Sequence, residues 1–246
     1  MRIRFKKWAR PELEASKFYI DNPEKYIGKW NGLFENKSPI HLELGCGKGG
    51  FISKISVKNP DINYIAIDLV DAMLGLAKRK VEEEYNQNNK EINNIYLTRY
   101  DIERIANIFG RDDKIERIYI NFCNPWPRGK HHKKRLTHTR QLEKYKQFLK
   151  ENGEIYSNKI QLTKVKIASD LNAEAINGEI YFKTDDDNLF NDSISYFKSS
   201  GFEIIKNTYD LQDEPEFWDN IKTEHEDMFT EQGIKIKALI ARVITN

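Results

Sequence analysis

The chain has 246 residues and a formal net charge of +2, from 40 Lys and Arg against 38 Asp and Glu. This length fits one large domain with appendages, and 39% hydrophobic residues are too many for a disordered chain. No apolar run approaches the roughly 20 residues that span a bilayer, and the basic N-terminus lacks the apolar region of a signal peptide, so we expect a cytoplasmic protein with no membrane partner.

Residues 1–38 are expected to form an N-terminal arm with a short helix, packed on a single domain of residues 39–246. The arm is strongly basic at its start, with five basic residues and no acid among residues 1–10. Such a segment suits a polyanion such as nucleic acid, although a solvated lysine-rich surface has the same composition.

From residue 39 onward, short β-branched runs alternate with amphipathic helical patterns. This order is typical of a doubly wound, Rossmann-like α/β fold with a parallel sheet in the order 3-2-1-4-5. The expected strands are 40–44, 64–69, 95–99, 117–122, 180–184 and 202–208, and the expected helices are 50–57, 72–86, 140–150 and 189–199. Residues 234–243 alternate in polarity at first, which predicts a C-terminal antiparallel strand.

A glycine-rich loop, Gly45–Gly50, follows the first expected strand and opens a helix, the setting of a nucleotide-binding loop. Gly45, Gly47 and Gly50 also satisfy the G-x-G-x-x-G pattern of dinucleotide sites. However, Glu43 places a carboxylate two residues before the loop, where it would repel a pyrophosphate but can bind the ammonium of a methionine moiety.

Two more acids end the next two expected strands. Asp68 is placed to accept hydrogen bonds from the ribose hydroxyls of an adenosine, and Asp101 from an adenine amino group. Each acid alone would also fit a helix cap. Together with Glu43, Gly45 and Gly47, they predict S-adenosylmethionine as the cofactor.

The fourth strand leads through Asn124-Pro125-Trp126 into a basic segment. Residues 128–150 hold nine basic residues and one acid, whereas residues 210–231 hold nine acids and one lysine. The net charge of +2 is therefore a cancellation, and the basic segment is predicted to bind nucleic-acid phosphates. Its histidines lack a matching ligand set, so no metal site is expected. Cys46 and Cys123 are expected to be free thiols.

A direct repeat interrupts the chain before the fifth strand. Asn152–Tyr156 recurs identically as Asn177–Tyr181, and the residues between the copies resemble nothing else in the chain. This pattern indicates an insertion at about 157–181. Because only the second copy runs directly into Phe182–Asp185, the fifth strand is assigned to it.

These motifs together resemble those of the tRNA (guanine-N7-)-methyltransferase family. The matching segments cover nearly the whole chain and are Lys7–Ala9, Gly28–Asn31, the glycine loop, Asn121–Thr137, Phe182–Asp185 and Asn220–Glu226. The resemblance implies a class I methyltransferase fold and transfer of a methyl group from S-adenosylmethionine to guanosine 46 in the tRNA variable loop. It also implies tRNA as the partner of a monomer or homodimer.

Carried over residue by residue, the resemblance implies two sets of contacts, with Asn124 and Asp185 as the catalytic pair. The cofactor would contact Glu43, Asp68, Asp101 and Asn124 beside Gly45 and Gly47. The substrate guanine or the RNA would contact Arg128, Lys130, His131, His132, Lys133, Lys134, Arg135, Asp185, Thr223, Glu224, His225 and Glu226. The sequence departs from the family at Asn124, where aspartate is usual, and at Asp68 and Arg128-Gly129.

Methylation at N7 of guanine makes modest chemical demands. N7 carries a free in-plane lone pair and no proton, so the reaction needs alignment and no general base. Asn124 can orient the reactants, although it cannot stabilise the positive charge that develops on the ring. Asp185 or Glu226 complements the N1–H and N2–H donors of guanine, and we hypothesise that one of them reads this edge.

Three other functions stay open from the sequence. Asn124-Pro125-Trp126 is similar to the N-P-P-[YFW] motif of amino-methyltransferases that act on adenine or cytosine. The asparagine and the insertion also fit a non-catalytic RNA-binding protein on a methyltransferase fold, and the glycine pattern fits a dehydrogenase. The identity of the methylated nucleoside and the binding of S-adenosylmethionine distinguish these alternatives.

Overall fold

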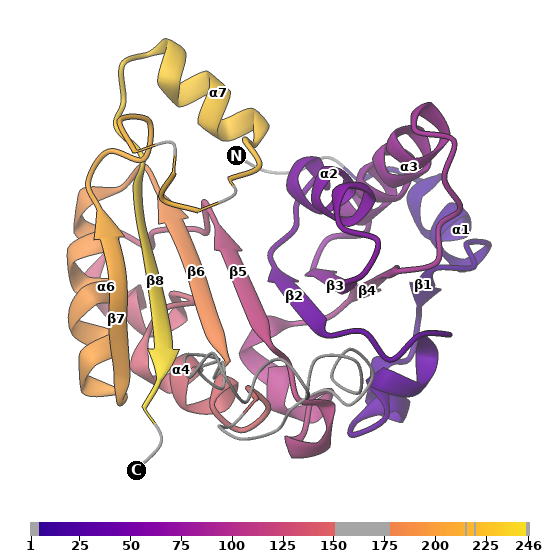
Figure 1. Ribbon diagram of the computed structural model, residues 1–246, viewed down its shortest axis with the longest axis horizontal. Helices are drawn as coiled ribbons and strands as arrows, with labels where there is room; N and C mark the ends of the chain where they lie inside the picture. Colours follow the sequence, from indigo (N-terminus) through magenta and orange to yellow (C-terminus); the bar gives the residue numbers. More distant parts are fainter. Residues whose placement is uncertain (1–4, 151–177, 215, 219, 245–246) are drawn as a thin grey trace, which may run out of the picture.

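A computed structural model describes residues 5–150, 178–214, 216–218 and 220–244. Its strands form one sheet in the order β1-β4-β3-β2-β5-β6-β8-β7 (Figure 1). The strands are β1 (Tyr19–Ile20), β2 (Ile40–Leu44), β3 (Asn63–Asp68), β4 (Ile95–Arg99), β5 (Arg117–Asn121), β6 (Glu179–Thr184), β7 (Phe202–Thr208) and β8 (Lys237–Val243). Strands β1 to β6 pair in parallel, whereas β8 is antiparallel to both β6 and β7. The expected doubly wound sheet with a C-terminal antiparallel strand is confirmed.

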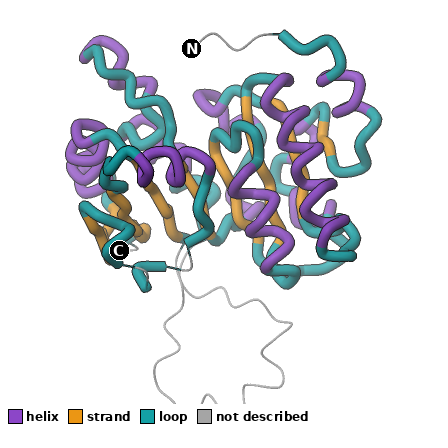
Figure 2. The backbone as a smooth tube through the Cα atoms, turned by 90° about the horizontal axis from the view of Figure 1, so that it is seen from above, coloured by secondary structure: helices purple, strands orange, loops and turns teal. Residues whose placement is uncertain are grey.

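Helices pack against this layer of strands (Figure 2). The α-helices are α1 (Ala9–Glu14), α2 (Gly50–Lys58), α3 (Asp71–Gln87), α4 (Thr139–Tyr145), α6 (Asp187–Ser199) and α7 (Glu224–Glu231). The 3-10 helices are η1 (Pro23–Tyr26), η2 (Trp30–Leu33), η3 (Ile102–Asn107), η4 (Arg111–Asp113) and η5 (Gly129–Lys134). Helices α1 and α2 both contact α3, and α4 contacts α6.

Two hydrophobic clusters cover the two faces of the sheet. Alternate residues of a strand point to opposite faces, and in β3 Ile65 and Ile67 join one cluster while Tyr64 and Ala66 join the other. Both faces are therefore buried, which explains why the expected strands read as nearly continuous apolar runs. The alternation matters for function because it sends Glu43 of β2 toward the face that α2 covers.

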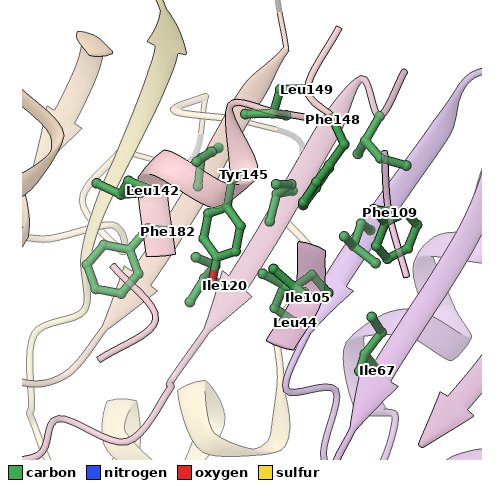
Figure 3. Packing of buried hydrophobic residues seen from close by; sticks show 14 of the residues in the cluster. Leu44, Ile67, Ile105, Phe109, Ile120, Leu142, Tyr145, Phe148, Leu149 and Phe182 are labelled. Atoms are coloured by element: carbon green, nitrogen blue, oxygen red, sulfur yellow. The ribbon is translucent and has the colours of Figure 1, made fainter. Parts of the chain in front are cut away.

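The expected helix over 140–150 ends early, at Tyr145. The chain then unwinds so that Ile115, just before β5, donates from its amide to the Phe148 carbonyl at 2.8 Å and accepts from the Lys150 amide at 2.8 Å. The apolar residues of the segment are buried as expected, and Leu142, Tyr145, Phe148 and Leu149 all face the core (Figure 3).

The N-terminal arm contributes more than the expected short helix. Tyr19–Ile20 form β1, which extends the sheet beyond β4. Helix α1 approaches α3 so closely that a Cβ at Gly75 would lie 2.8 Å from the Trp8 ring and 2.9 Å from the Ala9 Cβ. Glycine is thus required at this crossing.

The first repeat copy and most of the expected insertion lie outside the described residues, which resume at Gly178. The strand assignment to the second copy is confirmed because β6 begins at Glu179. The Gly178 amide donates to the Lys150 carbonyl at 2.8 Å, so the two described ends are neighbours in space (Figure 2). None of the described helices has the length and apolar character of a membrane span.

Candidate active site

The glycine loop between β2 and α2 turns through positive φ values. Gly45, Gly47 and Gly49 have φ of +80°, +54° and +77°. Gly49 also lies against α3, where an added Cβ would be 2.7 Å from the Ala77 Cβ. Backbone conformation and space together exclude a side chain there, so the loop keeps its tight path from strand to helix.

Glu43 lies buried below this loop, with 2% of its surface exposed. Asn121 at the end of β5 donates from Nδ2 to its Oε1 at 3.1 Å, whereas Oε2 has no hydrogen-bond partner among the described residues. Burial raises the pKa of this carboxyl to about 7. Because an unpaired buried carboxylate oxygen is costly, a cationic ligand group beside it would stabilise the site. The ammonium of S-adenosylmethionine fits this requirement.

A cavity of about 170 Å³ adjoins Glu43. Its lining comes from three distant parts of the chain: Glu43, Gly45, Cys46, Gly47, Lys48, Gly50 and Phe51, then Asn121 and Phe122, then Thr223, Glu224 and His225. The last group begins α7, which lies above the carboxyl ends of β5 and β6 (Figure 1). Lys80 of α3 forms an ion pair with Glu224 and so fixes the start of α7 across the cavity.

Asp68 and Asp101 follow β3 and β4, which continue the sheet from β2. Asp68 accepts from the amides of Gly47 and Val70, at 2.9 Å each, and burial raises its pKa. Asp101 caps η3 by accepting from the Glu103 amide at 3.0 Å. Both acids therefore have a structural role, and each oxygen that accepts one bond keeps a second lone pair for a ligand.

A second cavity, of about 320 Å³, lies on the same face of the sheet. It shares Phe51 and Asn121 with the first cavity and continues between Tyr119, Tyr181 and Trp218. The larger cavity lacks contact with the glycine loop and with Glu43. Glu43 and the glycine loop, the two features that predict the cofactor site, both line the smaller cavity.

The loop after β5 carries Asn124 between two residues in the left-handed region. Phe122 and Trp126 have backbone φ angles of +51° and +44°, values that residues other than glycine rarely adopt. The Asn124 side chain accepts from the Trp126 amide at 3.0 Å and so closes the turn. Such strain persists only where surrounding contacts fix the backbone. The exposed Asn124 lies at the edge where β5 ends.

The basic segment follows as η5 and presents most of its cations outward. Arg128, Lys130 and Lys133 are exposed, and His131, His132 and Lys134 are half-buried. The Trp126 ring lies 5.9 Å from the His131 ring and 5.1 Å from Lys134 Nζ. Trp126 is half-buried among these basic residues, a place where it can contact RNA, and it belongs to neither large core cluster.

Arg135 departs from the expectation that it contacts RNA. Its side chain is 1% exposed, and its guanidinium donates to the Pro125 carbonyl at 2.7 Å and to Asp192 of α6 at 2.5 Å. A buried guanidinium with these partners cannot present its charge to a phosphate on the surface. The high local density of basic residues in the sequence concealed this inward orientation.

Glu226 also differs from its expected role as a guanine reader. Its Oε2 lies 2.6 Å from Lys183 Nζ, and its Oε1 accepts from Asn220 Nδ2 at 2.7 Å. The carboxylate is only 1% exposed and lies between Lys183 and Asn220, so Glu226 holds α7 to β6 from inside the fold and does not face a substrate. Asp185 lies half-buried after β6, and its main-chain oxygen accepts from Lys237 Nζ at 2.9 Å. Of the two acids expected to read the guanine edge, Asp185 is the one at the surface.

The sequence reasoning missed two residues at this site, Asn121 and Lys183. A signal existed for Lys183, because a lysine inside a buried strand must have a partner for its charge. Its ammonium donates to Glu226, to Asn220 Oδ1 at 2.8 Å and to the Ile221 carbonyl at 3.1 Å. Asn121 had no comparable signal, because an asparagine at a strand end is common in turns.

The histidines and cysteines of the described residues form neither a metal-ligand cluster nor a disulfide. No group of three or more His, Cys, Asp and Glu side chains that could hold a metal occurs within the described ranges. Cys46 and Cys123 are free thiols, as expected, and burial raises the pKa of both.

Comparison with solved structures identifies the fold. The chain is similar to an antibiotic-related methyltransferase, with a TM-score of 0.52 and 14% identity over 100% of this chain and 97% of that one. It is also similar to the 16S rRNA methyltransferase KamB, with a TM-score of 0.53 and 10% identity over 99% and 96%. At such low identity these likenesses establish a class I methyltransferase fold and no more.

Comparison by sequence is far closer. A methyltransferase family model matches residues 37–159. The tRNA (guanine-N(7)-)-methyltransferase of Clostridium botulinum (strain Eklund 17B / Type B) is 54% identical over 98% of both chains. That of Acetivibrio thermocellus is 48% identical over 98% of this chain and 99% of its own. Together with the glycine loop, the strand-end acids and the basic segment, these matches show that the chain belongs to the tRNA (guanine-N(7)-)-methyltransferase family.

Proposed function

We propose that this protein transfers the methyl group of S-adenosylmethionine to N7 of guanine 46 in the variable loop of tRNA. The observation that carries the cofactor assignment is the unpartnered Oε2 of buried Glu43 beside the glycine loop. Membership of the family supports the tRNA guanine-N7 activity. The basic η5 segment beside the strand ends supports an RNA partner.

Each cofactor contact follows from the chemistry of one side chain. Glu43 would hold the ammonium of the methionine part, and Asp68 and Asp101 would use their remaining lone pairs for the ribose hydroxyls and the adenine amino group. When bound, the cofactor supplies an electrophilic methyl group on a positively charged sulfur. Phe122 and Thr223–His225 line the side of the cavity opposite the glycine loop and would bound this end of the cofactor.

The guanine would lie between the loops after β5 and β6. Asp185 can accept from N1–H and N2–H and so select guanine. Asn124 can orient the ring by hydrogen bonds, and no residue has to remove a proton from N7. Catalysis then depends on alignment, with N7 held roughly 3 Å from the methyl carbon.

The tRNA backbone would contact the outward cations of the basic segment. Arg128, Lys130 and Lys133 are exposed on η5 and the loop before it, and His131, His132 and Lys134 lie beside them. Their task is to place the variable loop so that one guanine reaches the strand ends. Phosphate contacts of this kind fix position without reading sequence.

Two measurements test the proposal. Calorimetry should detect binding of S-adenosylmethionine and no binding of NADH. Incubation with S-adenosylmethionine and unmodified bulk tRNA, followed by nucleoside mass spectrometry, should yield 7-methylguanosine. N6-methyladenosine in its place would favour the amino-methyltransferase alternative, and cofactor binding failure would favour a non-catalytic RNA-binding protein.

A further inference from the structure

Arg135 is the one residue of the segment 128–135 that is buried. Each of its three side-chain nitrogens has a partner. Nε donates to the Pro125 carbonyl at 2.7 Å, Nη1 donates to Asp192 Oδ2 at 2.5 Å, and Nη2 lies 3.1 Å from His132 Nε2. A guanidinium fixed at all three nitrogens has one orientation only.

These partners belong to different parts of the site. Pro125 directly follows Asn124 in the strained loop after β5. Asp192 lies in α6, which starts at Asp187, two residues after Asp185, and is capped by Asp186, whose Oδ1 accepts from the Leu189 amide at 2.6 Å. Arg135 thus connects the loop that carries Asn124 with the helix that follows Asp185.

The strain in the first loop makes this connection important. Phe122 and Trp126 both hold positive φ, and strained backbone relaxes unless neighbouring contacts prevent it. The Pro125 carbonyl, between the two strained residues, is held by Arg135. A second contact joins the segment of Arg135 to α6, because Thr137 Oγ1 lies 2.6 Å from Ser193 Oγ of that helix.

We infer that Arg135 is a positioning residue that sets the distance between Asn124 and Asp185 and thereby aligns the guanine for transfer. This inference rests on the proposed function for the role of those two residues. It differs from an RNA contact because Arg135 acts through the Pro125 carbonyl and through α6. Its exposed neighbour Lys133 provides the contrast within the same segment.

Kinetics separate the two roles. Arg135→Met should lower kcat by about 100-fold, the scale of a misplacement of about 1 Å, and should leave the tRNA Kd and its salt dependence within about twofold of the wild type. Lys133→Ala should raise the tRNA Kd and reduce the slope of log Kd against log salt by about one. The inference is overturned if Arg135→Met behaves as Lys133→Ala does, or if it keeps the wild-type kcat.

Asp192→Ala is a control that distinguishes loss of the positioning contact from misfolding of the Arg135 variant. Asp192 is 44% exposed, so its loss removes the ion pair without opening a cavity in the core. We expect kcat to fall by about tenfold with an unchanged tRNA Kd. Arg135→Lys should recover only part of the activity, because one ammonium cannot meet three partners in the geometry of a guanidinium.

Amide hydrogen exchange tests the inference without any enzymatic assay. The Trp126 amide is bound to Asn124 Oδ1 and the Phe122 amide to the Lys183 carbonyl. Both should exchange faster in Arg135→Met and Asp192→Ala and at the wild-type rate in Lys133→Ala. Unchanged exchange in the first two variants would refute the positioning role, whereas absence of methyl transfer by the wild type would refute the proposed function alone.

Discussion

Lys183 and Glu226 form a salt bridge of 2.6 Å whose side chains are 0% and 1% exposed. The pair joins β6 of the sheet to α7, whose first turn completes the cavity beside Glu43. The geometry of the cofactor cavity therefore depends on a buried contact between residues 43 positions apart in the chain.

Glu226→Gln should destabilise the protein by about 3 kcal/mol, because it leaves the buried Lys183 ammonium without a charged partner. Denaturant unfolding measures this loss. The affinity for S-adenosylmethionine should fall as well, since one of the two ion pairs that hold α7 across the cavity in the described part of the chain is lost and only Lys80–Glu224 remains. The double variant Lys183→Met/Glu226→Leu is the control and should regain most of the stability. Wild-type stability of Glu226→Gln would contradict the importance of the pair.

Binding of S-adenosylmethionine should strengthen as pH rises toward neutrality. The pKa of Glu43 is raised to about 7 by burial, so below this pH the carboxyl is protonated and cannot pair with an ammonium. Between about pH 5.5 and 7 the affinity should rise roughly tenfold, a range in which an α-amino group of pKa about 8 stays charged. Calorimetry on wild type and Glu43→Gln checks this. An equal pH dependence in both proteins would exclude Glu43 as its source.

The stability of the cofactor-free protein should show the opposite trend with pH. The folded protein keeps a proton on Glu43 up to about pH 7, whereas the unfolded chain loses it near the ordinary value of 4.5. Stability from this residue is thus greatest below about pH 4.5 and falls as pH rises to about 7, by up to about 3 kcal/mol. The free energy of unfolding is measured at pH 5 and at pH 7.5 for the wild type and for Glu43→Gln. The variant should lose less stability between these two pH values than the wild type does, because it lacks the titrating carboxyl.

Asn124→Asp should raise kcat by about tenfold, equivalent to about 1.4 kcal/mol at the transition state. Aspartate keeps the acceptor for the Trp126 amide and adds a negative charge near the guanine ring as it becomes positive. Asn124→Ala removes the acceptor, releases the turn and should lower kcat. Single-turnover rates measure both effects. Equal rates for the three proteins would show that residue 124 has no part in the chemistry.

Deletion of residues 157–181 should leave a folded protein. It joins the first repeat copy directly to Phe182, so the sequence that starts β6 is restored unchanged. Gly153 then stands three residues after Lys150, the separation of a β-turn, and its amide can donate the hydrogen bond to the Lys150 carbonyl that the Gly178 amide donates now. Circular dichroism and methyl transfer to tRNA check the result. Loss of cooperative unfolding would show that the segment is needed for the fold.

Much of the fold could be predicted because buried strands have a strong local pattern. The expected bounds of β2 and β4 agree with the structure, and β5 ends one residue early because Phe122 turns to positive φ. By contrast, β1 has two residues and no pattern to detect. The only buried residue of α7 is Glu226, so this helix lacks the apolar periodicity that identifies helices in a sequence.

The candidate site divides in the same way. The positions of Glu43, Asp68 and Asp101 on three neighbouring strands could be predicted because parallel strands end at one edge of a sheet. Only Glu43 of the three lines the cavity, and Asp68 reaches the glycine loop through the Gly47 amide. The contacts expected for Arg135 and Glu226 were wrong because the sequence alone does not show whether a charged residue faces solvent or a buried partner. Their partners, Asp192 and Lys183, are distant in sequence and become neighbours only through the sheet order.

The most direct test is to locate the methyl group on a single tRNA. Unmodified tRNA transcript is incubated with the protein and S-adenosylmethionine and is then cleaved chemically at 7-methylguanosine. We expect one cleavage site, at position 46, and none in a transcript in which that guanine is replaced by adenine. Cleavage at another guanine, or methylation of an exocyclic amine without any cleavage, would contradict the proposed function.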